Sequence, residues 1–125
     1  MSTNSPESRA PFGRAPEVTT LYERLCRIQE PKGYFFNNDL EMTFDLLEQL
    51  LVTKSQYTYM ACPCRLANGE ITADKDIICP CAYREEDVKE YGSCFCGLYV
   101  SKDWNEGGIP HVYVPERRPP ENIKF

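Results

Sequence analysis

The residues of this chain best suited to chemistry are six cysteines that form three Cys-x-Cys pairs. The pairs are Cys62/Cys64, Cys79/Cys81 and Cys94/Cys96. Proline stands at the centre of the first two pairs. Cysteine thiolates bind zinc ions and iron–sulfur clusters, and paired thiols also form disulfides. The spacing therefore predicts metal binding, redox chemistry or both.

The compartment of the protein bears on which of these uses applies. The first 16 residues contain no apolar stretch typical of a secretory signal, and no apolar run approaches the roughly 18 residues that span a membrane. We therefore expect a cytoplasmic protein, in which thiols stay reduced and structural disulfides are rare. This expectation disfavours three structural disulfides and favours a metal site or a redox site.

Zinc and an iron–sulfur cluster are the two metal sites that suit these cysteines. Structural zinc sites usually take cysteines separated by about two to four residues, whereas one residue separates the members of each pair here. A cubane cluster takes four thiolates, which would leave two thiols for one redox-active disulfide. We therefore favour an iron–sulfur site and keep zinc as the alternative. Spacing alone does not say which thiols bind.

The three ordered motifs resemble those of the catalytic chain of ferredoxin–thioredoxin reductase. The resemblance covers roughly residues 20–120 and includes a Pro-Glu-Arg-Arg segment at Pro115–Arg118. It implies that four cysteines bind a [4Fe-4S] cluster: Cys62, Cys79, Cys81 and Cys94. It also implies that Cys64 and Cys96 form the active-site disulfide beside the cluster, with Cys64 as the exposed thiol that attacks the substrate.

The resemblance implies a ferredoxin-dependent disulfide reductase that acts on thioredoxin or a similar protein. Ferredoxin delivers one electron at a time, whereas reduction of a disulfide takes two, so a cluster beside the disulfide would hold the half-reduced state. Plant-type relatives work with a second, variable subunit, and such a subunit is compatible with this chain. The alternative from another class is a zinc- or iron–sulfur-binding module without catalysis.

Two features depart from the photosynthetic enzymes of that family. The segment between the first two motifs, residues 65–78, is shorter, and the segment before the third motif, residues 82–93, is longer. Phe95 stands where those enzymes have a histidine that is thought to assist proton handling beside the disulfide. We therefore expect a member of a non-photosynthetic branch, with a different substrate or different redox tuning.

Two charged or titratable residues have alternative interpretations. Arg65 follows Cys64 directly and could lower its pKa by proximity, or could be a solvated surface side chain. His111 is the single histidine of the chain. It could replace the missing proton relay, but an ordinary partly buried or surface histidine is the preferred interpretation.

The remaining sequence predicts the elements that position the cysteines. Residues 17–30 and 37–57 carry apolar residues at helical spacing, so we expect two amphipathic helices that supply most of the core. The expected buried positions are Val18, Leu21, Tyr22, Leu25 and Ile28 in the first helix, and Leu40, Phe44, Leu47, Leu50 and Leu51 in the second. Asn37 or Asn38 is a candidate cap for the second helix. Cys26 lies beside the first apolar stripe and is expected to be a core thiol.

The second half of the chain predicts little regular structure. Only residues 83–92 look like a further helix, while residues 97–101 and 111–114 suit short strands or extended segments. Residues 1–16, rich in serine, proline and arginine, predict a flexible tail before a domain of residues 17–125. The predicted fold is a single small α+β domain, mostly helical, with irregular proline-rich loops between residues 60 and 97 that hold the cluster.

The overall charge narrows the expected partners. The formal net charge is −5 at pH 7 and the isoelectric point is about 4.9. Nucleic-acid binding usually needs a basic face, so we expect no nucleic-acid partner. The resemblance to the reductase family, and not the charge, implies ferredoxin and a thioredoxin-like protein as partners.

Overall fold

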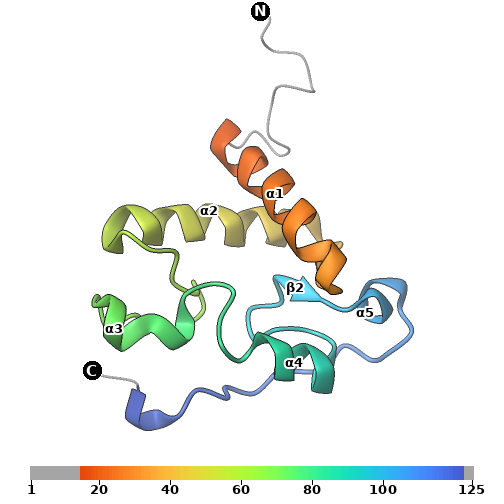
Figure 1. Cartoon of the computed structure of the whole chain (residues 1–125). Coiled ribbons are helices and arrows are strands. Elements are labelled where there is room, and N and C mark those ends of the chain that lie inside the picture. The colour runs from red at the N-terminus through yellow and green to blue at the C-terminus, as the bar shows by residue number, and fades with distance from the viewer. Residues whose placement is uncertain (1–14, 123–125) are drawn as a thin grey trace, which may run out of the picture.

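Two long helices form one side of the molecule. The computed structural model describes residues 15–122, and in it α1 (Pro16–Gln29) crosses α2 (Leu40–Tyr57) (Figure 1). Pro16 stands in the first turn of α1, where the missing N–H of proline costs no helical hydrogen bond. The predicted flexible tail lies outside the described residues, except for its last two positions. Both predicted amphipathic helices are confirmed.

Asp39 caps the start of α2. Its side chain accepts a hydrogen bond from the Met42 N–H at 3.2 Å. The prediction that Asn37 or Asn38 caps this helix is wrong, because α2 begins at Leu40 and its N-cap residue is Asp39. The Asn37 amide donates to the Gly97 carbonyl at 3.1 Å, and the Asn38 amide donates to the Asn105 carbonyl at 3.1 Å. These two bonds tie the start of α2 to the segment that follows the third cysteine pair.

The apolar core lies between the two long helices and the chain that follows the third cysteine pair. Its buried members are Val18, Phe36, Phe44, Leu47, Leu50, Cys94, Leu98 and Tyr99. Leu21, Leu25 and Cys26 pack against it, as predicted. Ile28 and Leu40 are wrong predictions, because they are 44% and 41% exposed. Each lies in a terminal turn of its helix, where helical spacing alone does not decide what covers a side chain.

A two-stranded antiparallel sheet joins the two halves of the chain. In it β1 (Phe35–Phe36) pairs with β2 (Tyr99–Val100), with Phe35 opposite Val100 and Phe36 opposite Tyr99. The strand predicted within residues 97–101 is therefore confirmed. Residues 111–114 form no strand; they run as an extended segment in which Val114 is buried and Tyr113 is 82% exposed.

The cysteine-rich half contains three short α-helices, α3 (Ile71–Asp74), α4 (Arg84–Tyr91) and α5 (Lys102–Glu106). Single 3-10 turns occur as η4 (Glu30–Lys32), η5 (Lys75–Ile77) and η6 (Pro120–Asn122). Helix α4 confirms the prediction for residues 83–92, and Gly92 ends it in the left-handed conformation at φ 83°. The prediction of only one helix after residue 59 is wrong, because α3 and α5 are too short to show a helical period.

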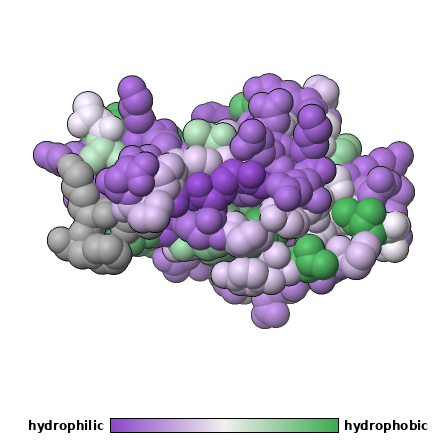
Figure 2. Space-filling view, turned by 90° about the horizontal axis from the view of Figure 1, so that it is seen from below, coloured by the Kyte–Doolittle hydropathy of each residue, from purple (hydrophilic) through white to green (hydrophobic). Residues whose placement is uncertain are grey.

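The C-terminal segment, residues 115–122, closes the underside of the cysteine loops. In Figure 1 it runs below α3 and α4, and Figure 2 shows this face as mainly hydrophilic with a few separate hydrophobic spots. The structure confirms a single small α+β domain that is mostly helical. Within residues 15–122, none of the helices is both long and apolar enough to cross a membrane.

Candidate active site

The structure brings all three Cys-x-Cys pairs into one site. A cavity between the loops is lined by five of the six paired cysteines: Cys62, Cys79, Cys81, Cys94 and Cys96. These include all four predicted cluster ligands. Cys64 is exposed and lies outside the cavity wall. The fold therefore separates one accessible thiol from five enclosed ones.

Backbone hydrogen bonds set the first two pairs side by side. Ala61 and Ile78 form an antiparallel bridge. Next to it, the Cys62 N–H donates to the Ile77 carbonyl and the Cys79 N–H donates to the Met60 carbonyl, each at 2.8 Å. These bonds hold Cys62 and Cys79 on neighbouring, hydrogen-bonded segments.

The third pair sits on a tight turn that leads directly into β2. The Cys94 N–H donates to the Tyr99 carbonyl at 2.8 Å, and the Tyr99 N–H donates back to Cys94 Sγ at 3.3 Å. Gly97 turns the chain in the left-handed conformation at φ 80°, which residues with side chains rarely adopt. The turn therefore attaches the third pair to the sheet and, through it, to the helical core.

Cys96 lies against the first pair. Its Sγ lies 2.9 Å from Cys62 Sγ, and Cys64 is near enough for Cys96 to lower its pKa. All seven cysteines lie within the described residues and are free thiols. Hydrogen bonding with Cys96 lowers the pKa of Cys62 to about 7 and lowers the pKa of Cys64, whereas it raises the pKa of Cys96. Cys96 is therefore the least acidic of these three thiols.

The other three cysteines of the cavity are the half-buried Cys79 and Cys81 and the buried Cys94. Burial raises the pKa of Cys79 and of Cys81, and it raises the pKa of Cys94 to about 11. A metal ligand must lose its proton, so a positively charged centre in the cavity would take the place of these protons. Four thiols around the walls of one cavity fit a multi-iron cluster. Within residues 15–122, no three His, Cys, Asp or Glu side chains converge on a point that could hold a single ion.

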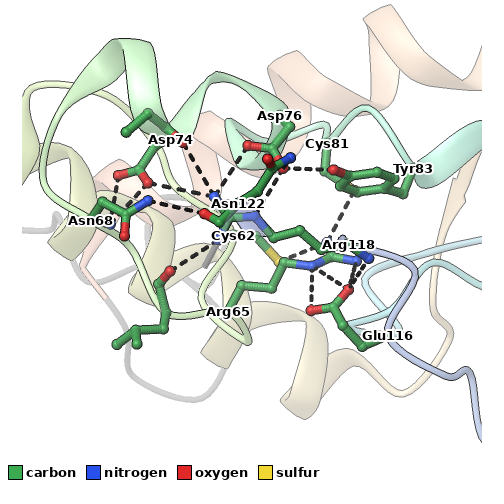
Figure 3. Close-up of polar contacts among 12 residues, drawn as sticks. Cys62, Arg65, Asn68, Asp74, Asp76, Cys81, Tyr83, Glu116, Arg118 and Asn122 are labelled. Carbon is green, nitrogen blue, oxygen red and sulfur yellow. Dashed lines mark hydrogen bonds and ion pairs between the residues drawn. The ribbon is translucent and has the colours of Figure 1, made fainter. Parts of the chain in front are cut away.

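Arg65 places a buried positive charge beside this cavity (Figure 3). Its Nη1 donates to Cys81 Sγ at 3.3 Å and lies 3.8 Å from Cys62 Sγ. Its Nε and Nη2 donate to the Glu116 carboxylate at 2.9 and 2.7 Å. Since its side chain is only 1% exposed, the alternative of a solvated surface arginine is wrong. Arg65 also helps to lower the pKa of Cys64, after the larger effect of the bond to Cys96.

Three further residues complete the site, although the sequence pattern does not single them out. Glu116 holds Arg65, while Arg84 and Tyr99 line the cavity. Arg84 donates to Gln29 Oε1 at 2.7 Å and lies over the Tyr34 ring, 3.7 Å from its centroid. One signal was available, because each arginine follows a predicted ligand by three residues: Arg65 follows Cys62, and Arg84 follows Cys81.

Comparison with known proteins identifies the family of this chain. The model of the family "Ferredoxin thioredoxin reductase catalytic beta chain" matches residues 14–111, which contain all three pairs. The chain belongs to this family. A catalytic chain of ferredoxin–thioredoxin reductase from Guillardia theta is 37% identical over 71 residues, or 55% of this chain. The match spans 66% of that relative, slightly less than two thirds of its length. The resemblance inferred from the cysteine motifs is thereby confirmed.

Phe95 is the central residue of the third Cys-x-Cys pair. The ring lies over Arg65, with the guanidinium carbon 4.5 Å from the ring centroid. His111 does not line the cavity; it stacks on Trp104 at a centroid distance of 3.8 Å, and its Nε2 lies 2.9 Å from the Trp104 carbonyl. These contacts agree with the preferred interpretation of His111 as an ordinary histidine.

Proposed function

We propose that this protein is a ferredoxin-dependent disulfide reductase. It would pass electrons through a [4Fe-4S] cluster to the disulfide of thioredoxin or a similar small protein. The arrangement of the paired cysteines carries this proposal. Five of them line one cavity, and the sixth, Cys64, is exposed beside it and near enough to Cys96 for that thiol to lower its pKa. The family membership supports a reductase, and the division of roles among the cysteines is part of this proposal.

The cavity would hold the cluster on four cysteines: Cys62, Cys79, Cys81 and Cys94. When bound, the cluster would supply single electrons to the disulfide that Cys64 and Cys96 form. Four thiolates in a buried cavity need compensating positive charge. Arg65, which donates to Cys81, and Arg84, which lines the cavity, provide that charge from the protein.

The exposed thiol and its neighbour would carry out the exchange with the substrate. The Cys64 thiolate attacks one sulfur of the substrate disulfide, which forms a mixed disulfide and releases the first substrate thiolate. Cys96 then attacks Cys64 Sγ and releases the second substrate thiolate, which leaves a Cys64–Cys96 disulfide. Protons for both leaving thiolates come from Cys96 and solvent. Two electrons, delivered singly, and one proton from solvent return the pair to the Cys64 thiolate and the Cys96 thiol.

The partners in this proposal follow from the family name. Ferredoxin would be the electron donor and thioredoxin the acceptor, because both appear in the name of the family and of the relative from Guillardia theta. A second subunit is compatible with the proposal. Nothing in the exchange mechanism depends on it.

Metal analysis of protein purified without oxygen tests the cofactor. We expect iron and acid-labile sulfide at about four each per chain, with a brown colour and absorption near ~400 nm. Zinc without sulfide would replace the proposed enzyme by a metal-binding module. Thiol counting before and after reduction should show two additional thiols, from Cys64 and Cys96.

Trapping of the substrate tests the order of the two thiols. The variant Cys96→Ser lacks the resolving thiol, so it should accumulate a mixed disulfide between Cys64 and thioredoxin. The variant Cys64→Ser should form none. Cys26→Ser is the matched control, because Cys26 packs on the helical core outside the cavity. A trapped partner on Cys96 would show that the two roles are reversed.

A further inference from the structure

The hydroxyl of Tyr99 has no hydrogen-bond partner in the described part of the chain. The residue is 2% exposed, so water does not solvate it freely. A buried hydroxyl without a partner is destabilising, and phenylalanine would fill the same place without that cost. The choice of tyrosine therefore needs a partner that the chain itself does not provide.

The position of Tyr99 indicates where that partner lies. Tyr99 lines the cysteine cavity together with Cys79 and Cys94. Two other tyrosine hydroxyls in this half of the molecule donate to carboxylates: Tyr59 to Asp74 at 2.5 Å, and Tyr83 to Asp76 at 2.6 Å. Neither of those tyrosines lines the cavity. Tyr99 therefore differs from both in facing the space that the thiols enclose.

Its neighbours hold the Tyr99 ring in place and strengthen its hydroxyl as a donor. Phe36 stacks on the ring at a centroid distance of 5.2 Å. The guanidinium carbon of Arg84 lies 4.9 Å from the ring centroid. A cation over an aromatic face draws electron density from the ring, which makes the phenol O–H a better donor. The backbone bonds with Cys94 fix the same residue at the cavity wall.

We propose that the Tyr99 hydroxyl donates a hydrogen bond to a sulfur of the cluster held in this cavity. The acceptor is a sulfide of the cluster or the sulfur of a cysteine that binds it. This inference rests on the function proposed above. A hydrogen bond to such a sulfur stabilises the reduced, more negative state of an iron–sulfur centre more than the oxidised state. Tyr99 therefore raises the reduction potential at which the protein accepts electrons.

The variant Tyr99→Phe tests this role in the iron-loaded protein. Its reduction potential is measured by a redox titration that follows the paramagnetic signal of the reduced cluster. We expect the reduced state to lose about tenfold in stability relative to the oxidised state, a fall of about 59 mV for a one-electron couple. Tyr59→Phe is the matched control, because it removes a buried hydroxyl bonded to Asp74 outside the cavity. Its potential should equal that of the wild type.

The outcomes separate this inference from the proposed function. Wild-type protein without iron and sulfide would overturn the proposed function. A fully loaded Tyr99→Phe variant with an unshifted potential would overturn only the role of Tyr99, and would mean that a buried water satisfies its hydroxyl. If Tyr99→Phe does not retain iron, 3-fluorotyrosine at position 99 provides a stronger donor. Its potential should then rise, and a potential that stays equal or falls overturns the inference.

Discussion

The helical half and the cysteine half of this molecule are stabilised by different interactions. Helices α1 and α2 pack through buried apolar side chains such as Phe44, Leu47 and Leu50. The loops of the cysteine half are joined by ion pairs and hydrogen bonds instead. This difference has a physical reason. Only the part of the cavity wall formed by Cys94, Leu98 and Tyr99 belongs to the apolar core, and the loops on its other sides bury charged side chains, such as Arg65, that need polar partners.

The C-terminal segment supplies most of the polar ties. Arg118 is buried and donates to Asp76 at 2.9 Å and to the Leu66 carbonyl at 3.2 Å. Arg117 donates to the buried Asp87 at 2.8 Å. Glu116 holds Arg65 at the cavity, as Figure 3 shows. Consecutive side chains of one segment therefore reach the first cysteine loop, the loop before the second pair, and α4.

The largest expected effect comes from removing one of the proposed cluster ligands. Cys79→Ser should lose iron and the absorption near ~400 nm, and should loosen the cysteine half, because the cluster would tie its loops together. Cys64→Ser should keep both, because Cys64 lies outside the cavity wall. Iron content and circular dichroism of the two variants measure this difference. Loss of iron from Cys64→Ser with retention by Cys62→Ser would reverse the predicted partition.

Loss of the buried ion pairs of Arg118 should lower the free energy of unfolding nearly as much as loss of a proposed cluster ligand. Arg118→Met leaves Asp76 and the buried Asp74 without their cation. Removal of one partner of a buried ion pair typically costs roughly 3–5 kcal/mol. Urea unfolding of the iron-loaded protein measures the change. Lys102→Met is the matched control, because its ion pair with Glu106 is exposed and its loss should change stability by less than about 1 kcal/mol.

A cavity in the helical half should lower stability without reaching the site. Leu47 is fully buried in the core, so Leu47→Ala should cost roughly 2–5 kcal/mol in urea unfolding. Iron content and the rate of Cys64 alkylation should match those of the wild type, because Leu47 does not line the cavity. Substantial iron loss from this variant would show that the two halves are more strongly coupled than their contacts indicate.

The smallest expected effect is a sensitivity to acid that arises in the cysteine half. Burial opposes ionisation of Asp76, but hydrogen bonds from Arg118 and Tyr83 outweigh it and lower its pKa. In Asp74 and in Glu116, too, burial opposes ionisation but hydrogen bonds outweigh it and lower the pKa. A lowered folded-state pKa contributes stability that is complete above the unfolded value, about 3.9 for aspartate, and is lost as the pH falls through the folded value. The urea midpoint should therefore decline below about pH 4.

The variant Asp76→Asn identifies the source of that decline. Its urea midpoint should be lower than that of the wild type at pH 7. It should also fall less steeply between about pH 4 and pH 2, since one of the titrating carboxyls is gone. Parallel curves for the two proteins would show that Asp76 contributes nothing to the acid sensitivity.

The features of this structure that depend on local sequence pattern could be predicted from the sequence alone. Apolar residues at helical spacing were sufficient to predict α1, α2 and most of their buried faces, because side chains three and four apart share one face of a helix. The three Cys-x-Cys motifs were sufficient to predict the family. Prediction failed at Ile28 and Leu40, where the apolar pattern continues to the helix ends but the core does not.

The burial of the site and the placement of its charged side chains depend on contacts between segments that are distant in the sequence. The contact of Arg65 with Glu116 joins positions 51 residues apart, and no local pattern encodes such a pair. The same holds for Arg84, which reaches back to Gln29 across 55 residues. The orphaned Tyr99 hydroxyl looks in sequence like an ordinary strand residue. Its burial and its lack of a partner follow from the packing of distant segments, which places it at the cavity wall.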